Sequence, residues 1–95
     1  MKPLVKTYMI TYDLSKPGQD YSDFKKILTE DISNGVWCHF WDSSYLFQTN
    51  LTANEAVDKL RPAIDSTDRV IIVEAAKDHQ GWMTDKQWDY INKMF

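Results

Sequence analysis

The chain is poor in features on which whole classes of protein depend. It has a single cysteine, Cys38, which excludes an internal disulfide framework and a cysteine-rich zinc site. Its three glycines are too few for a glycine-rich phosphate-binding loop. The first residues lack the apolar run of a signal peptide, and no stretch approaches the length of a membrane span. We therefore expect a reduced, cytoplasmic protein with no membrane partner.

What the chain does contain is typical of one globular domain. It has 95 residues, of which 43% are hydrophobic and 26% are charged, so disorder and low complexity are excluded. This length predicts a single domain over residues 1–95. Aromatic residues make up 14% of the chain, which is a high share.

The charge balance is mildly acidic. Eleven Lys and Arg residues face fourteen Asp and Glu residues, which gives a net charge of −3 and no general basic field for nucleic acid. Three lysines still gather near the expected first turn and first helix: Lys16, Lys25 and Lys26. They are the candidate contacts to RNA or DNA, and the alternative is a solvated helix face diluted by Asp20 and Asp23.

Local patterns predict four strands and three helices. Runs of β-branched and aromatic residues predict strands over 4–12, 36–41, 44–49 and 69–76. Helical spacing of apolar residues predicts one helix between about 20 and 34 and a second between 52 and 62. Two capping boxes are expected, with Thr52 paired to Glu55 and Thr84 paired to Gln87, and the second of these opens a final short helix.

The order of these elements predicts the fold class. The pattern β-α-β-β-α-β is typical of a ferredoxin-like α+β domain, in which two helices cover one face of a four-stranded antiparallel sheet. In that topology the strands lie in the spatial order four, one, three, two. A C-terminal extension over about 77–95 adds the final helix.

Both faces of the expected sheet are largely apolar. In the last strand Ile71 and Val73 point one way while Val70 and Ile72 point the other, although a sheet with one solvated face alternates apolar with polar residues. In the second strand, strict alternation places Trp37, His39 and Trp41 on one face. Two internal helices can cover only one face, so the other needs a second cover.

Either the C-terminal helix or a second copy of the chain can supply that cover. The helix would use Trp82, Trp88 and Ile91. A symmetric homodimer is the commonest way to bury such a face, and we expect one here. The expected interface residues lie on the first strand, the last strand and the extension: Tyr8, Ile10, Tyr12, Val70, Ile72 and Trp82.

Carboxylates at one end of the sheet are the candidate chemistry. Asp13 ends the first, central strand, and Asp68 begins the neighbouring last strand, with Asp65 in the adjoining loop. Such oxygen ligands suit Mg²⁺ or Mn²⁺, which can polarise a phosphodiester and activate water. Asp13 is then the candidate catalytic residue, and Asp13 with Asp68 the candidate metal ligands. The alternative is structural, because an Asp after a strand often caps a turn and Asp68 can pair with Arg69.

The remaining nucleophile and base candidates have ordinary explanations. His39 lies in mid-strand between tryptophans, which favours packing or contact with a partner, and His79 lies in a polar loop, which favours solvation. Cys38 is a strand residue beside aromatic residues and is expected to be buried and inert.

The pattern also resembles a known family. A first strand ending in Tyr12-Asp13-Leu14, followed by helix, aromatic hairpin, helix and the strand from Asp68 to Val73, is similar to two groups. These are the small CRISPR-associated adaptation endoribonucleases of the second type and the virulence-associated protein D toxins. The resemblance implies a ferredoxin-like fold, homodimers joined through their sheets, and a metal-binding aspartate at Asp13. The segments 12–21 and Gln80-Gly81-Trp82 resemble small uncharacterised proteins of bacteria and phages.

These observations leave three functions open. The first is a small homodimeric interaction or nucleic-acid-associated module with no assigned catalysis, bound to RNA, DNA or a protein partner. The second is a metal-dependent endoribonuclease or nuclease that uses Asp13. The third is a regulatory module that binds a small molecule or a protein at the dimer cleft.

Overall fold

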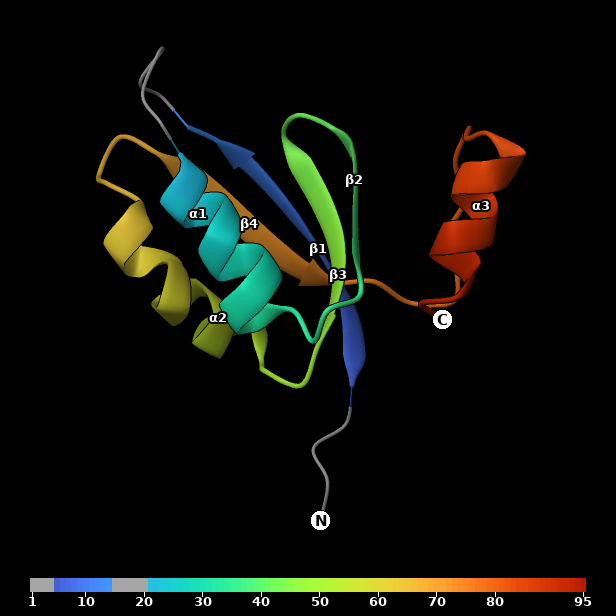
Figure 1. The fold of residues 1–95 in the computed structure, drawn as a ribbon, viewed down its shortest axis with the longest axis horizontal. Helices are drawn as coiled ribbons and strands as arrows, with labels where there is room; N and C mark the ends of the chain where they lie inside the picture. Colours follow the sequence, from blue (N-terminus) through green and yellow to red (C-terminus); the bar gives the residue numbers. More distant parts are fainter. Residues whose placement is uncertain (1–4, 15–20) are drawn as a thin grey trace.

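The structure is a computed structural model that describes residues 5–14 and 21–95 (Figure 1). In chain order the strands are β1 (Lys6–Asp13), β2 (Trp37–Trp41), β3 (Ser44–Thr49) and β4 (Arg69–Glu74). The helices are α1 (Ser22–Lys26), continued by the π-helical segment η1 (Ile27–Ile32), α2 (Ala53–Leu60), continued by the 3₁₀ turn η2 (Arg61–Ala63), and α3 (Asp85–Asn92). Leu4 of the expected first strand, the turn expected over 15–18, Lys16 and Asp20 lie outside the described residues.

The four strands form one antiparallel sheet in the order β2-β3-β1-β4. This confirms the expected α+β class and the four-stranded antiparallel sheet. β1 is central: Tyr8 lies opposite Phe47 of β3 on one side and opposite Glu74 of β4 on the other. Figure 1 shows α1 and α2 on one side of this sheet and α3 on the other.

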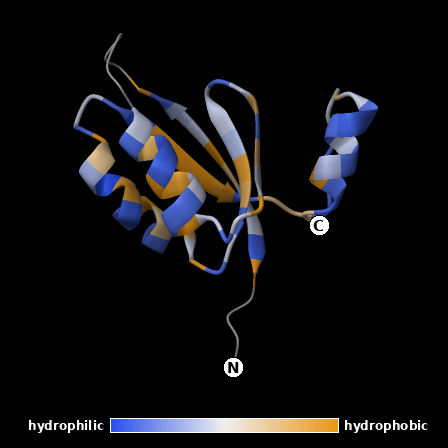
Figure 2. Cartoon of the chain, viewed as in Figure 1, coloured by the Kyte–Doolittle hydropathy of each residue, from blue (hydrophilic) through white to orange (hydrophobic). Residues whose placement is uncertain are grey.

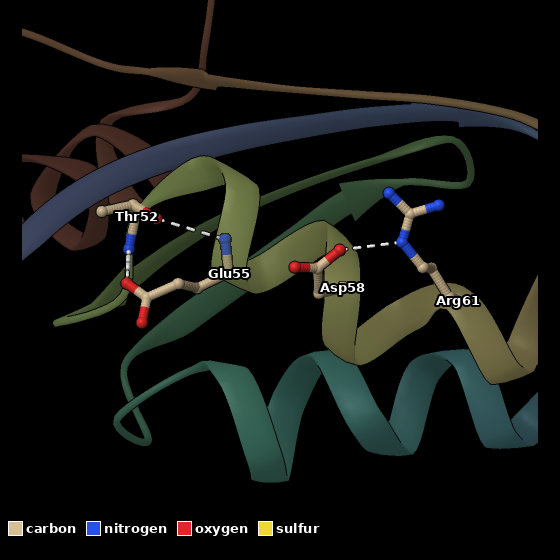
Figure 3. A network of polar contacts seen from close by, with 4 residues as sticks. All are labelled: Thr52, Glu55, Asp58 and Arg61. Atoms are coloured by element: carbon tan, nitrogen blue, oxygen red, sulfur yellow. Dashed lines mark hydrogen bonds and ion pairs between the residues drawn. The ribbon is translucent and has the colours of Figure 1, made fainter.

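Both expected capping boxes are present. The Thr52 hydroxyl accepts a hydrogen bond from the Glu55 amide at 3.2 Å, and the Glu55 carboxylate accepts one from the Thr52 amide at 3.0 Å (Figure 3). Thr84 and Gln87 make the same reciprocal pair at the start of α3. Each box satisfies two backbone N–H groups that a helix start would otherwise leave unpaired, which explains why these helices begin where they do.

The apolar spacing predicted a regular α-helix for the first helix, but its second half is a π-helix with wider turns. After α1 the backbone widens into the π-helical η1, and the Ser33 amide donates to the Leu28 carbonyl five residues back. Phe24, Leu28 and Ile32 are buried on one face of the combined helix. Gly35 then has a φ of 105°, a conformation that an L side chain rarely adopts, so the chain can turn sharply into β2.

The main core lies between the sheet and the two helical segments. β1, β3 and β4 each contribute alternate residues to it, and α1, η1 and α2 contribute apolar residues from one face. Figure 2 shows hydrophobic positions recurring among hydrophilic ones along these elements. Its buried members are Tyr8, Ile10, Phe24, Leu28, Ile32, Tyr45, Phe47, Ala56, Leu60 and Ile72.

A second, smaller core lies on the other face of the sheet, beneath α3. Ile91 and Met94 pack with Cys38 of β2, and Trp88 lies partly buried beside them. Three hydrogen bonds fasten the helix: the Thr7 hydroxyl and the Gln48 amide both donate to the Met94 carbonyl, and the Tyr90 hydroxyl donates to the Trp37 carbonyl at 2.7 Å. The C-terminal helix therefore covers part of the second face, as one of the two expected covers.

Trp82 is not part of that cover. Its side chain is 99% exposed, whereas Ile91 is 8% exposed. In the alternative of cover from within one chain, the place given to Trp82 beside Trp88 and Ile91 is wrong, because Gly81 and Met83 line the groove on the second face and Trp82 does not.

A β-bulge in β2 changes which side its last residues face. Cys38 lies opposite Leu46, and Trp41 lies opposite Ser44, so two residues of β2 oppose Tyr45 alone. His39 stacks on Tyr45, which belongs to the core under α1 and α2, whereas Trp41 lies on the α3 side of the sheet with Leu46. The expectation that Trp41 shares a face with Trp37 and His39 is therefore wrong.

Most of the expected interface residues lie on the face of the sheet that α1 and α2 cover. Five of them belong to or pack against the main core under α1 and α2, namely Tyr8, Ile10, Tyr12, Val70 and Ile72. This part of the interface prediction is corrected, because alternation divides each strand into two sets without showing which set the helices cover. The large rings of Tyr8, Tyr45 and Phe47 fill the space beneath α1 and α2. The residues that alternate with them in the strands point to the second face of the sheet.

Candidate functional site

An uncovered strip of sheet is the most unusual surface of the molecule. α3 covers β2 and β3 on the second face, but Met9 of β1 and Ile71 and Val73 of β4 stay 38%, 57% and 48% exposed. Met9 lies opposite Val73, and Thr11 lies opposite Ile71, so the four side chains form one continuous surface, which we call the open strip. Three neighbouring exposed apolar side chains on a sheet favour a binding surface for a partner or ligand.

The open strip is free of charge along its length. At one end of the strip, the next residues that alternation places on the same face are the charged Asp13 and Arg69, which lie opposite each other. The Arg69 guanidinium donates to the carbonyls of Ser66 and Asp68, which holds it toward its own loop. Depletion of charge at the centre, with charges at the edge, is the pattern of a protein interface.

An apolar groove adjoins the open strip. It has a volume of about 160 Å³ and lies between the sheet and the segment that carries α3. Met9 and Leu46 form its floor, and Trp41, Met83 and Trp88 stand around it. A smaller hollow of about 50 Å³, which reaches Cys38 and Phe40, shares Met9, Trp41, Leu46, Met83 and Ile91 with it. An apolar space of roughly 150 Å³ accepts a benzene-sized ring.

Two tryptophans line this groove, Trp41, which is 51% exposed, and Trp88. Trp82 does not line it, but its chain neighbours Gly81 and Met83 do. Neither the groove nor the position of Trp41 was predicted from the sequence. The bulge in β2 and the docking of α3 create both, and the only signal in the sequence is the unusual density of aromatic residues.

His79 also lines the groove, next to Gln80. Its Nδ1 lies 2.7 Å from the Ala76 carbonyl oxygen, and because a carbonyl only accepts, Nδ1 carries the proton. The ring stacks on Phe95 at 4.2 Å between centroids and lies 6.1 Å from Trp88. His79 is therefore a packed residue rather than the freely solvated one that the polar loop suggested.

The candidate carboxylates have different surroundings. Asp68 is 8% exposed; one carboxylate oxygen accepts from the Tyr21 hydroxyl at 3.4 Å and the other from the Asp65 amide at 3.1 Å. Asp65 in turn accepts from the amide and hydroxyl of Thr67. Asp13 is exposed and lies opposite Arg69. Within residues 5–14 and 21–95 no three acidic, histidine or cysteine side chains gather around one point. The metal site at Asp13 and Asp68 stays a prediction.

We expect Asp68→Ala to lower the free energy of unfolding by about 1–3 kcal/mol, because it removes two part-buried hydrogen bonds accepted by a buried carboxylate. Asp13→Ala, at an exposed position, should change it by no more than about 0.5 kcal/mol. Urea unfolding measures both. Equal losses in the two variants, or a stabilisation of the unaltered chain by Mg²⁺ or Mn²⁺ that both variants lose, would contradict the structural role of Asp68.

The lysines expected to contact nucleic acid lie away from the open strip. Lys25 and Lys26 are exposed in the last turn of α1, on the side of the sheet opposite to α3, and Lys16 lies outside the described residues. On the second helical segment, Arg61 of η2 pairs with Asp58 of α2 at 2.8 Å (Figure 3). Binding of RNA or DNA by these lysines stays a prediction.

Three further titratable residues, Cys38, Tyr12 and His39, lie packed against the sheet. Cys38 is buried as expected, and that burial raises the pKa of its thiol, so the unreactive protonated form dominates at neutral pH. Burial, with the nearby Tyr45 and Asp42, raises the pKa of Tyr12 to about 12, and its hydroxyl donates to the Asp42 carbonyl at 2.7 Å. His39 stacks on Tyr45 at 4.1 Å, which agrees with its expected packing role.

Comparison with known proteins adds no relative. No family model, no curated protein and no solved structure matches this chain. The resemblance to the CRISPR-associated and virulence-associated proteins therefore stays a prediction. In the part of the chain that the structure describes, no helix has the length and apolar character needed to cross a membrane.

Proposed function

We propose that this protein is a small interaction module that works as a homodimer joined through the open strip. The observation that carries the proposal is the uncharged surface of Met9, Thr11, Ile71 and Val73, which α3 leaves uncovered although it packs on the same face of the sheet. Exposed aliphatic surface of this kind gains about 25 cal/mol for each Å² removed from water.

Further exposed aromatic side chains belong to the same region of the chain and support a dimer. Trp41 lines the groove beside the open strip and is 51% exposed, and Trp82, between two residues that line the groove, is 99% exposed. A stable dimer buries about 800 Å² of each partner, part of it polar. A two-fold axis lets the same surface serve both copies, so no second surface on the molecule is required.

We further propose that the fold is of the ferredoxin-like kind. Counted from the β4 edge, the sheet runs β4-β1-β3-β2, and the helices α1 and α2 follow β1 and β3 in the chain. Both features support the assignment. In this fold one face of the sheet is left without helices, and here α3 occupies only half of it.

The dimer is tested with Val73→Glu, which places a carboxylate at the centre of the open strip. Size-exclusion chromatography with light scattering at about 100 μM chain should give a dimer mass for the unaltered chain and a monomer mass for the variant. Asn54→Glu is the control, because it adds the same charge at an exposed position of α2, on the other side of the sheet.

The control should remain a dimer, and Val73→Glu should keep its circular dichroism spectrum because Val73 is already half exposed. A monomer mass for the unaltered chain at this concentration would overturn the proposal. So would a dimer that Val73→Glu leaves intact.

A further inference from the structure

We infer that Trp82 of each copy inserts its indole ring into the apolar groove of the other copy. The inference rests on the proposed homodimer and names the contact that anchors it. It accounts for two features of the described chain that face no partner within one copy: a fully exposed tryptophan and a ring-sized apolar groove.

The exposure of Trp82 is the first observation. Its side chain is 99% exposed, while Trp37, Trp41 and Trp88 all make contacts within the chain. A side chain that buries up to about 250 Å² when covered gains more from a partner than any other residue type. Tryptophan is accordingly enriched among the residues that carry most of the binding energy at protein interfaces.

The groove is the second observation. Its volume of about 160 Å³ and its connected hollow of about 50 Å³ match the size of an aromatic ring. Two methionines line it, Met9 of the sheet and Met83 of the segment before α3, and their flexible side chains can adapt to a ring and make favourable contacts between sulfur and the aromatic edge. Trp41 supplies a second aromatic surface against which an inserted indole can pack.

The position of the two features on one surface favours a second copy as the occupant. Trp82 lies between Gly81 and Met83, which line the groove, and Met9 belongs to both the groove and the open strip. A two-fold axis through this region pairs each Trp82 with the partner's groove and buries both open strips together. The absence of charge from the open strip lets two chains of net charge −3 approach there.

The groove can be filled from within its own copy by a single substitution. A Cβ added at Gly81 would meet the Trp88 ring at 4.0 Å, an ordinary contact, and Gly81 does not have a positive φ. Gly81→Leu should therefore fold and place its side chain in the groove, while Gly81→Ala adds only the tolerated methyl group and serves as the control.

The experiment measures dimer affinity by sedimentation velocity for two variants and for their mixture. Trp82→Ala keeps the groove but has no ring to insert, and Gly81→Leu keeps the ring but has no groove. Each homodimer loses both anchoring contacts and should weaken by roughly 1,000-fold, at about 30-fold for each tryptophan contact. Gly81→Ala should dimerise like the unaltered chain.

The mixture gives the decisive result. A heterodimer of Trp82→Ala with Gly81→Leu retains one intact contact, so an equimolar mixture should associate about 30-fold more tightly than either variant alone. A mixture no tighter than its components would overturn the inference, as would a Trp82→Ala homodimer of unaltered affinity. In both cases the proposed dimer would still stand if Val73→Glu dissociates it, which separates the two failures. Loss of dimer in Gly81→Ala would also overturn the inference, because the groove stays open in that variant.

Discussion

Replacing Phe47 by alanine should lower the free energy of unfolding by about 3–5 kcal/mol. Phe47 is fully buried at the centre of the main core, and its ring stacks on Tyr8 of the neighbouring strand at 6.0 Å between centroids. A domain of this size is stable by about 5–15 kcal/mol, so the loss is a large part of the total. Urea unfolding followed by circular dichroism measures it.

The control for this prediction keeps most of the volume of the ring. Phe47→Leu should cost only about 1–2 kcal/mol, since the cavity it leaves is smaller. Trp41→Ala, at a half-exposed aromatic residue of the adjacent strand, tests whether any lost ring has the same effect. If Trp41→Ala lowers the free energy of unfolding of the separated monomer as much as Phe47→Ala does, Phe47 is not at the centre of the core.

Ile91→Asp should release α3 from the sheet. Ile91 packs against Cys38 and is 8% exposed, and a carboxylate cannot be buried there without a partner. The cost of keeping the helix docked exceeds about 3 kcal/mol, so we expect α3 to detach while the main core stays folded. The free energy of unfolding of the remaining domain then becomes insensitive to further changes in α3.

The thiol of Cys38 reports this release. In the unaltered chain it is buried and its pKa is raised, so a disulfide reagent should modify it slowly. Ile91→Asp should raise the modification rate by about 100-fold or more, in line with a docking free energy near 3 kcal/mol. Asn92→Asp, which adds the same charge at the next, exposed position, should leave the rate unchanged. Slow modification in Ile91→Asp would show that α3 is not what covers Cys38.

Local signals in the sequence predicted the elements well, for physical reasons. Thr52 with Glu55 and Thr84 with Gln87 satisfy backbone donors within four residues, so these helix starts depend on no distant contact. The third strand, at 44–49, was likewise predicted to the residue. The π-helical η1 was not, because the spacing of its apolar residues, among them the buried Leu28 and Ile32, predicts a helix without showing how wide its turns are.

The site could not be predicted to the same extent. Alternation in β4 separates Ile71 and Val73 from Val70 and Ile72, but only the packing of α1 and α2 decides which pair is covered. The bulge that turns Trp41 toward the groove has no signature in its own residues. Asp68 was singled out as a metal ligand from its position alone, whereas its hydrogen bonds to Tyr21 and to the Asp65 amide depend on the folded loop.

Mixed-label NMR tests the central claim most directly. Chains labelled with ¹³C are combined in equal amounts with unlabelled chains, and filtered NOE spectra record only contacts between copies. Contacts should appear at the methyl groups of Met9, Ile71 and Val73, and Leu28 and Leu60, beneath α1 and α2, should show none. Spectra without any contacts between copies, or with contacts confined to the exposed surface of α1 and α2, would contradict a module built to associate through the uncovered half of its sheet.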